Sequence, residues 1–249
     1  MAEERGFKQN FIRSFIIGVV ISFVAYMIIV RVNWARMGLD FDGGPKPDAA
    51  VEEAARAAAV TETIRVGGKT WMKRNLNVWT RNSWCYDDNQ DNCAEYGRLY
   101  TWHAAKRACA SLGDGWRLST RHDWDALVNA AGGANIAGTR LKSQTGWPPV
   151  EIYDSILISV GTDDFGFSAL PGGERYGEAH WKPEGGGIPV FYGVGHYHGV
   201  GVNPYARWWT ATSRSKGRAN LIGIGPAKVV GLDDHYWNTD GYSVRCVKD

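Results

Sequence analysis

The sequence lacks the marks of several large functional classes. It has no block of basic residues, and its 28 Lys and Arg nearly balance its 26 Asp and Glu, so nothing in the composition favours binding to nucleic acid. It contains no G-x-S-x-G, H-E-x-x-H or phosphate-binding loop motif, and no pair of carboxylates stands out as an acid and a base. We therefore expect a protein that binds no nucleic acid and is not an enzyme.

Cysteine is also scarce, and its spacing disfavours structural zinc. The four cysteines are Cys85, Cys93, Cys109 and Cys246, and none of them lies in a C-x-x-C pair. A bridge between Cys85 and Cys93 would close a small polar loop, and Cys109 and Cys246 would then join the middle of the chain to its last strand. Two bridges would place this part of the chain in an oxidising compartment, whereas four free thiols would remove that inference.

One long uncharged apolar run lies near the N-terminus. A helix over residues 14–30, from Ser14 to Val30, would nearly cross a hydrocarbon layer of about 30 Å. A cleaved signal peptide is the alternative, but the run is long for one and no small-x-small site follows it closely. We expect a retained anchor in the lipid bilayer. The flanking basic residues favour a cytoplasmic N-terminus only weakly, so the expected disulfides decide that the C-terminal part is periplasmic or extracellular.

Composition divides the chain into four parts. We expect a cytoplasmic tail over residues 1–10, a transmembrane anchor over residues 11–32, a linker or spacer over residues 33–60 and a folded domain over residues 61–249. The spacer ends in an alanine-rich stretch with strong helix propensity but little apolar face. This stretch is predicted to be a short helix or a frayed coil.

The folded part shows an α+β pattern. Helices are predicted over residues 99–109 and 119–131, where apolar residues recur at helical spacing and Ser119 or Thr120 can cap the second helix. Short strands are predicted over residues 63–66, 69–72, 166–170, 206–212, 220–224 and 242–247. The 31 glycines suit tight turns, and the 12 tryptophans and 11 tyrosines suit either a core of flat rings or a surface that binds by stacking.

Six segments, taken together and in order, resemble a known family. They are residues 68–77 (GKTWMKRNLN), 96–102 (YGRLYTW), 115–124 (GWRLSTRHDW), 161–173 (GTDDFGFSALPGG), 208–212 (WWTAT) and 241–249 (GYSVRCVKD). In these segments the chain is similar to the Fibrobacter succinogenes major paralogous domain family, over roughly residues 61–249. The link from Cys109 to Trp116 is longer than is usual in that family, and Ser119 stands where proline is usual.

The resemblance implies a C-type-lectin-like or formylglycine-generating-enzyme-like fold. In such a fold two helices pack on short twisted antiparallel sheets that are joined by long loops. The resemblance further implies an extracytoplasmic domain in which Cys109, at the end of a helix, pairs with Cys246 on the last strand. It brings no established molecular function.

Three sets of residues are candidates for ligand binding. Asp87, Asn89 and Asp91 alternate like the oxygen ligands of a calcium loop, although the EF-hand pattern fails after them, and a turn capped by its own side chains is the alternative. Residues 237–240 (WNTD) stand where calcium-dependent lectins place Trp-Asn-Asp, but the usual Glu-Pro-Asn partner is absent and a turn rich in Asn and Asp is the favoured explanation. Aromatic residues of the long loops predict a platform for polysaccharide, or else the core beneath those loops. These are Tyr176, Trp181, Phe191, Tyr192, Tyr197 and Tyr205.

These observations favour a membrane-anchored extracytoplasmic module that binds a glycan or a protein of the cell envelope. Calcium is the one cofactor that the sequence suggests. A structural or assembly subunit of pilin-like type is the second hypothesis, although the glutamate expected early in a pilin helix is absent. The third is an enzyme related to formylglycine-generating proteins, which would need a reactive cysteine pair; here the four cysteines are better used as bridges.

Overall fold

The computed structural model describes residues 44–152, 155–157, 160–177, 180–183, 189–192, 197–198, 204–213, 215–225 and 230–249. They belong to a folded unit that spans residues 42–249. The apolar run over residues 14–30 lies outside the described residues. Within them, no helix combines the length and the hydrophobicity needed to cross a membrane.

Five α-helices lie in the described part of the chain, whereas the sequence predicted two in the folded domain and left a third open in the alanine-rich stretch. They are α2 (Ala49–Thr61), α3 (Gln90–Tyr96), α4 (Trp102–Ala110), α5 (Arg121–Ala130) and α6 (Ala134–Leu141), with the short 3-10 helix η1 (Tyr86–Asp88). Both predicted helices are present as α4 and α5. Helix α4 begins later than predicted because Leu99 and Tyr100 pair within a sheet and Thr101 caps the helix. Helix α5 begins after Thr120, whose side chain caps it.

The named strands pair antiparallel and are short. They are β1 (Thr63–Val66), β2 (Lys69–Met72), β3 (Ser83–Trp84), β4 (Leu99–Tyr100), β5 (Arg117–Leu118), β6 (Val150–Ile152), β7 (Ser155–Leu157), β8 (Glu174–Arg175), β9 (His180–Pro183), β10 (Pro189–Tyr192), β11 (Tyr197–His198), β12 (Ala206–Trp209), β13 (Arg218–Ile224), β14 (Val230–Trp237), β15 (Gly241–Tyr242) and β16 (Cys246–Lys248). The sheet orders are β1-β2-β16-β5, β11-β8-β15-β4-β3 and β12-β13-β14, with two hairpins, β6-β7 and β9-β10. The α+β prediction is therefore confirmed.

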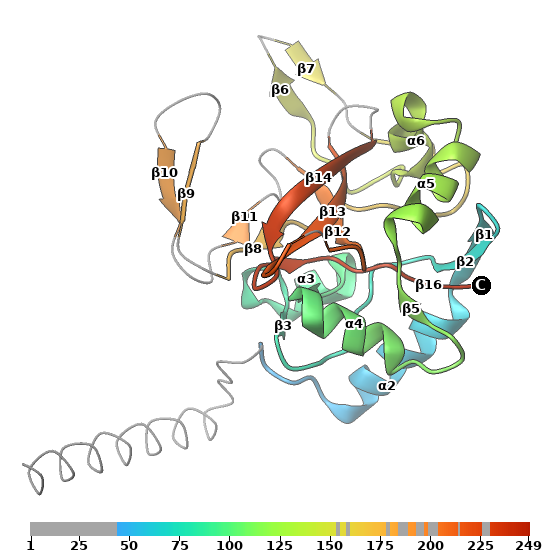
Figure 1. The fold of residues 1–249 in the computed structure, drawn as a ribbon, viewed down its shortest axis with the longest axis vertical. Helices are drawn as coiled ribbons and strands as arrows, with labels where there is room; N and C mark the ends of the chain where they lie inside the picture. The colour runs from blue at the N-terminus through green and yellow to red at the C-terminus, as the bar shows by residue number, and fades with distance from the viewer. Residues whose placement is uncertain are drawn as a thin grey trace, which may run out of the picture. The chain divides into compact units, whose positions relative to one another are not determined.

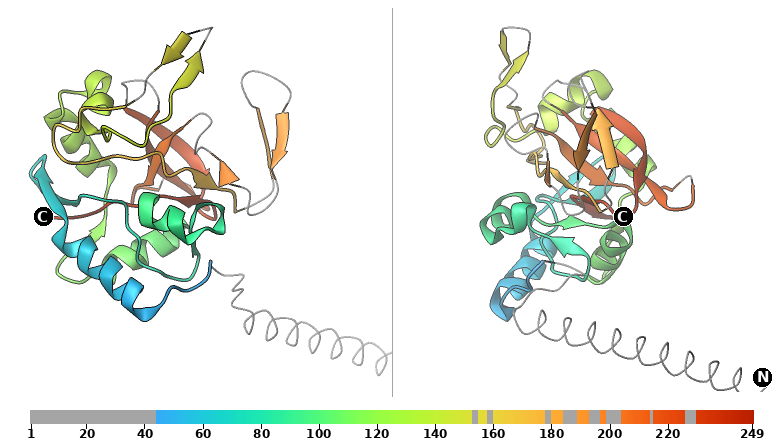
Figure 2. Two further views of the ribbon diagram at one scale, coloured as in Figure 1. Left: turned by 180° about the vertical axis from the view of Figure 1, so that it is seen from behind. Right: turned by 90° about the vertical axis from the view of Figure 1, so that its left-hand side faces the viewer.

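Two hydrophobic clusters form the core, and strand β12 contributes a tryptophan to each of them. Trp208 packs with Trp71 and Trp124 in one cluster, whereas Trp209 packs with Tyr242 in the other. Neighbouring residues of a strand point to opposite faces, so two consecutive tryptophans fill two separate cores. Figure 1 shows α5 and α6 on one side of this arrangement and α2 and α4 on another. Figure 2 shows the last strand, β16, ending beside the β1-β2 hairpin, with which it pairs.

The alanine-rich segment is a helix, one of the two possibilities that the sequence left open. One residue of α2, Ala59, is 5% exposed and belongs to a core cluster. Another, Glu52, accepts a hydrogen bond from the backbone N–H of Trp79 at 2.8 Å. Helix α2 therefore packs on the domain.

The predicted strand over residues 166–170 is wrong. This segment is a loop in which Gly166 and Ser168 have positive φ angles of 67° and 49°, which extended strands do not allow. The Asp163 carboxylate holds the loop, because it accepts hydrogen bonds from both the backbone N–H and the hydroxyl of Ser168. Local side-chain bonding of this kind competes with strand pairing.

Candidate functional site

Two disulfides frame the domain, as predicted. Cys85 is bonded to Cys93, and Cys109 on α4 is bonded to Cys246 on β16, which is also the pairing that the resemblance implied. No cysteine is free. A buried guanidinium packs against the first bridge, since Arg98 Nη1 lies 3.5 Å from Cys85 Sγ and 3.6 Å from Cys93 Sγ.

The suggested calcium ligands lie together on the surface near the first disulfide. Asn89 caps helix α3, and its side-chain oxygen accepts a hydrogen bond from the backbone N–H of Asp91 at 3.0 Å. Asp87 lies in η1 with a φ of 55°. Nowhere in the described residues do three His, Cys, Asp or Glu side chains gather as a metal site would require. Calcium binding by Asp87, Asn89 and Asp91 stays a prediction.

The residues of the predicted aromatic platform fall into two groups. Tyr176 is 1% exposed and donates its hydroxyl to Glu174 at 2.9 Å, so its ring belongs to the interior rather than to an open platform. Tyr205 is half-buried, with the guanidinium of Arg207 4.5 Å from its ring centre. The side chains of Trp181, Phe191, Tyr192 and Tyr197 lie outside the described residues, and this part of the prediction stays open.

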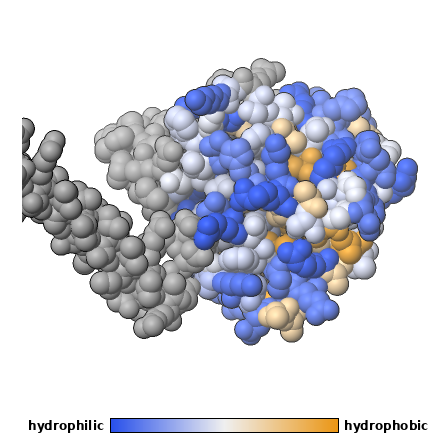
Figure 3. All heavy atoms as spheres, turned by 60° about the horizontal axis from the view of Figure 1, so that its bottom comes forward, coloured by the Kyte–Doolittle hydropathy of each residue, from blue (hydrophilic) through white to orange (hydrophobic). Residues whose placement is uncertain are grey.

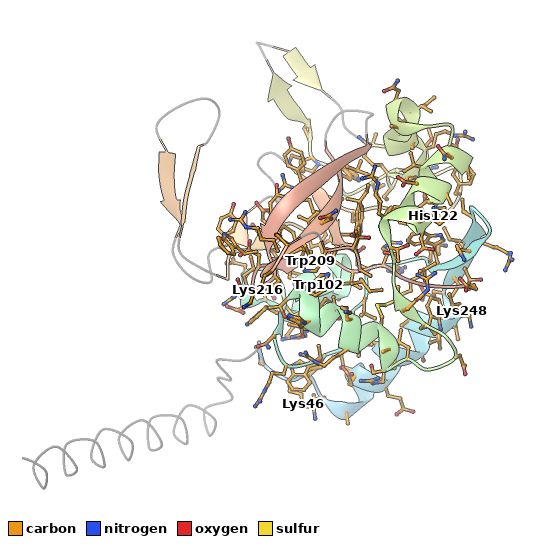
Figure 4. The ribbon with its side chains drawn as sticks, viewed as in Figure 1. Lys46, Trp102, His122, Trp209, Lys216 and Lys248 are labelled. Atoms are coloured by element: carbon orange, nitrogen blue, oxygen red, sulfur yellow. A yellow bond between two sulfur atoms is a disulfide. The ribbon has the colours of Figure 1, made fainter. Side chains whose placement is uncertain are left out.

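An aromatic surface that the sequence did not reveal lies where α4 begins beside the turn after β14. We call it the Trp102–Trp237 face, and its residues are Trp102, His103, Lys106, Arg218, Trp237 and Asn238. Trp237 is 38% exposed, and among the residues whose exposure the structure describes it is the one exposed aromatic side chain. Trp102 is half-buried. Figure 4 labels Trp102, which lies at the start of α4.

Hydrogen bonds fix the two parts of this face together. The backbone N–H of Trp102 donates to the carbonyl of Asn238 at 3.1 Å, and its indole N–H donates to the carbonyl of Thr210 at 2.8 Å. The Asn238 amide lies 3.4 Å from the Nε2 atom of His103. Cations lie over both indoles, with Lys106 4.5 Å from the Trp102 ring centre and Arg218 4.0 Å from that of Trp237. The face thus combines rings, cations and an amide at fixed positions.

In the turn over residues 237–240, one of the polar side chains is buried. Asp240 is only 2% exposed, and its carboxylate accepts a hydrogen bond from the backbone N–H of Gly177 at 2.8 Å. This carboxylate therefore anchors the segment after β8. The same turn places Trp237 and Asn238 at the surface.

A polar pocket of about 240 Å³ lies on a different part of the domain. We call it the Arg245 pocket, and it is lined by Lys73, Arg74, Asn75, Glu95, Ser143, Ser168, Leu170 and Arg245. A second hollow of about 280 Å³ shares Arg74, Asn75 and Glu95 with it and continues between α2 and α3. Its further lining includes alanines of α2. On the face where α2 and α4 lie, Figure 3 shows only small hydrophobic patches, separated by hydrophilic residues.

The Arg245 side chain is held by a dense set of acceptors. Its Nε atom donates to Asn75 Oδ1 at 2.7 Å. Its Nη1 atom lies 3.0, 2.6 and 2.8 Å from the carbonyl oxygens of Met72, Lys73 and Phe167, and its Nη2 atom lies 3.2 Å from that of Ser168. The guanidinium also packs on the Phe167 ring, 4.3 Å from its centre. This one side chain joins three segments that are distant in sequence.

The family of the chain follows from its sequence as a whole. Compared with known protein families, residues 64–248 match the Fibrobacter succinogenes major domain. The chain belongs to this family. No curated protein and no solved structure matches it.

Both candidate surfaces lie inside this Fibrobacter succinogenes major domain. The matched residues include the two disulfides, the Trp102–Trp237 face and the whole lining of the Arg245 pocket, whereas α2 precedes them. Rings, amides and cations suit stacking and hydrogen bonding, and every cysteine of the domain is used in a bridge.

Proposed function

We propose that this protein is a membrane-anchored binding module whose disulfide-bonded domain lies outside the cytoplasm and recognises a glycan of the cell envelope. Residues 14–30 would hold it in the lipid bilayer, and the two disulfides support an oxidising compartment for the remainder. The C-type-lectin-like fold belongs to the same proposal. It is supported by the bridge between α4 and the last strand and by helices packed on short antiparallel sheets.

The observation that carries the proposal is the exposed indole of Trp237 within the Trp102–Trp237 face. Indole faces stack on the apolar faces of sugar rings, and neighbouring amides and cations bind hydroxyl groups. Asn238 and Arg218 lie beside Trp237 in the turn and on the paired strand. The backbone hydrogen bond from Trp102 to Asn238 holds this turn against α4, so the face is formed before a ligand arrives.

Two other functions are less well supported. Both disulfides deprive a formylglycine-related enzyme of the reactive thiols that it would need. A structural or assembly subunit would use the N-terminal segment to pack beside other helices. Cross-linking in intact membranes separates this role from glycan binding, because regular oligomers in the absence of glycan favour assembly.

The test is retention of the full-length protein, in detergent, on a panel of insoluble polysaccharides. Trp237→Ala should reduce retention on the best glycan by about 30-fold, since a central tryptophan of a binding surface contributes about 2 kcal/mol or more. Ile136→Ala is the matched control, because Ile136 is 46% exposed on α6 and lies outside the face. Absence of retention on every glycan, or equal losses in both variants, would refute the proposal.

A further inference from the structure

Arg245 is a buried cation whose charge no carboxylate neutralises directly. Arg245 is 1% exposed, and no ion pair joins its guanidinium to another described residue. Desolvation lowers its pKa to about 9, while Asp163 raises the pKa and Arg74 lowers it, so the guanidinium is charged at neutral pH. Asp163, the carboxylate that raises this pKa, already accepts two hydrogen bonds from Ser168. The surrounding acceptors offset part of the desolvation cost of this buried charge, and an anionic ligand would offset more of it.

The hydrogen bonds of Arg245 also leave capacity for a ligand. A guanidinium has five N–H donors, two of them on Nη2. The Nη1 atom has three carbonyl acceptors for two hydrogens, whereas Nη2 has one, the carbonyl of Ser168. One N–H of Nη2 therefore has no acceptor among the described residues. This donor belongs to a side chain that lines the Arg245 pocket.

The remaining lining adds positive charge with a single negative group. Lys73 is exposed, and its ammonium group makes no hydrogen bond or ion pair within the described part of the chain. Arg74 pairs with Glu62 at 2.9 Å on the exposed rim. The formal charge of the lining is +2, because it has three cations, Lys73, Arg74 and Arg245, and one anion, Glu95. The ion pair between Arg74 and Glu62 lowers the effective charge to about +1.

We propose that the Arg245 pocket binds the carboxylate of a sugar acid of monosaccharide size. A monoanion matches the effective charge of about +1 on the lining. The second negative charge of a dianion such as phosphate would be repelled by the carboxylate of Glu95. Lys73 and the spare N–H of Arg245 would hold the carboxylate oxygens, and Ser143 and Glu95 would accept hydrogen bonds from hydroxyl groups. A volume of about 240 Å³ suits one sugar unit rather than a larger compound.

This inference goes beyond the proposed function, because the pocket shares no residue with the Trp102–Trp237 face. The two can fail separately. Trp237→Ala should leave binding of a free sugar acid unchanged while it lowers retention on glycan. Loss of sugar-acid binding in Trp237→Ala would place that binding at the aromatic face and overturn the inference.

Calorimetric titration of the full-length protein with glucuronate and galacturonate tests the inference. Glucose, which is neutral, and inorganic phosphate and sulfate, which carry more negative charge, are titrated separately for comparison. Saturable binding of a sugar acid, at least tenfold tighter than binding of phosphate, sulfate or glucose, is expected. No saturable binding, or equal affinity for phosphate, would overturn it.

Charge variants locate the site. Lys73→Glu should weaken binding of the sugar acid at least tenfold, and Lys73→Gln, which keeps the length of the side chain, should weaken it several-fold. Because the ammonium group of Lys73 is exposed and has no partner in the described residues, both variants should melt at the wild-type temperature. Lys46→Glu, at a lysine that lies over Trp79, makes the same charge change elsewhere (Figure 4). Equal losses in Lys46→Glu and Lys73→Glu would overturn the proposed location.

Discussion

Asn75 accepts a hydrogen bond from Arg245 across 170 residues of sequence, with 2.7 Å between Asn75 Oδ1 and Arg245 Nε. The same oxygen accepts from the indole N–H of Trp208 at 2.8 Å, and the Asn75 amide nitrogen donates to the carbonyl of Tyr96 at 2.8 Å. Asn75 is 8% exposed. One side-chain amide is therefore hydrogen-bonded to the last segment of the chain, to a core tryptophan and to the end of α3.

Asn75→Ala should reduce the free energy of unfolding by about 3 kcal/mol, because it leaves a charged donor and an indole N–H buried without an acceptor. Urea unfolding monitored by tryptophan fluorescence measures this loss. Asn77→Ala is the control, since Asn77 is half-buried two residues away and its side chain makes no hydrogen bond in the described structure. It should lower stability by less than about 0.5 kcal/mol. Similar losses in the two variants would contradict the role given to Asn75.

The two disulfides should contribute unequally to stability. The Cys109–Cys246 bridge spans 137 residues and the Cys85–Cys93 bridge spans 8, so loop-closure entropy predicts about 5 and about 2.5 kcal/mol respectively. Replacing Cys109 and Cys246 together with alanine should therefore lower the urea midpoint further than replacing Cys85 and Cys93. The reverse order would show that the local bridge, against which Arg98 packs, matters more than chain entropy.

Local features of the fold could be predicted from the sequence. The strands Thr63–Val66 and Lys69–Met72 have the predicted bounds, because Gly67-Gly68 between them can adopt the positive φ angles of 61° and 77° that the tight turn requires. Helix α5 begins where Thr120 forms a capping box with Asp123. In each case the signal lies within a few neighbouring residues.

Non-local features could not be predicted in this way. Arg245 is surrounded by carbonyls of Met72, Lys73, Phe167 and Ser168, which are distant from it in sequence. The exposure of the Trp237 indole depends on how β14 pairs with β13. Alternating Phe167 and Ala169 resemble a strand, and both are indeed buried, but hydrogen bonds from Ser168 to the Asp163 carboxylate hold their segment in a loop.

Gly67 and Gly68 form a matched pair for a test of the β1-β2 turn. A Cβ atom at Gly67 would lie 2.8 Å from the carbonyl carbon of Ala126 in α5, whereas a Cβ atom at Gly68 meets nothing within 4 Å. Both glycines have positive φ, so Gly68→Ala should cost only the strain of that conformation, about 1 kcal/mol. Gly67→Ala should cost clearly more, because α5 must move. Equal melting temperatures of the two variants would show that the hairpin does not pack closely on α5.

Asp123 should make part of the stability depend on pH. Its carboxylate accepts hydrogen bonds from Arg117 at 2.6 and 3.0 Å and from the backbone N–H of Thr120 at 2.7 Å. Burial raises the pKa of Asp123, but these hydrogen bonds outweigh burial and lower the pKa from 3.8 to about 2. A carboxylate with a lowered pKa stabilises the folded state above its unfolded pKa, and this contribution disappears as pH falls through the folded pKa.

We therefore expect Asp123→Asn to reduce the free energy of unfolding by about 2 kcal/mol at pH 6, because a lowered pKa of this size corresponds to that energy. The difference from the wild type should shrink steadily as pH falls from 4 to 2. Urea unfolding at a series of pH values measures it. Asp125→Asn is the control, since Asp125 pairs with Arg121 at 3.0 Å but its side chain is 49% exposed, and exposed pairs contribute less than about 1 kcal/mol. A difference for Asp123→Asn that stays constant down to pH 2 would mean that the carboxylate's charge does not stabilise the start of α5.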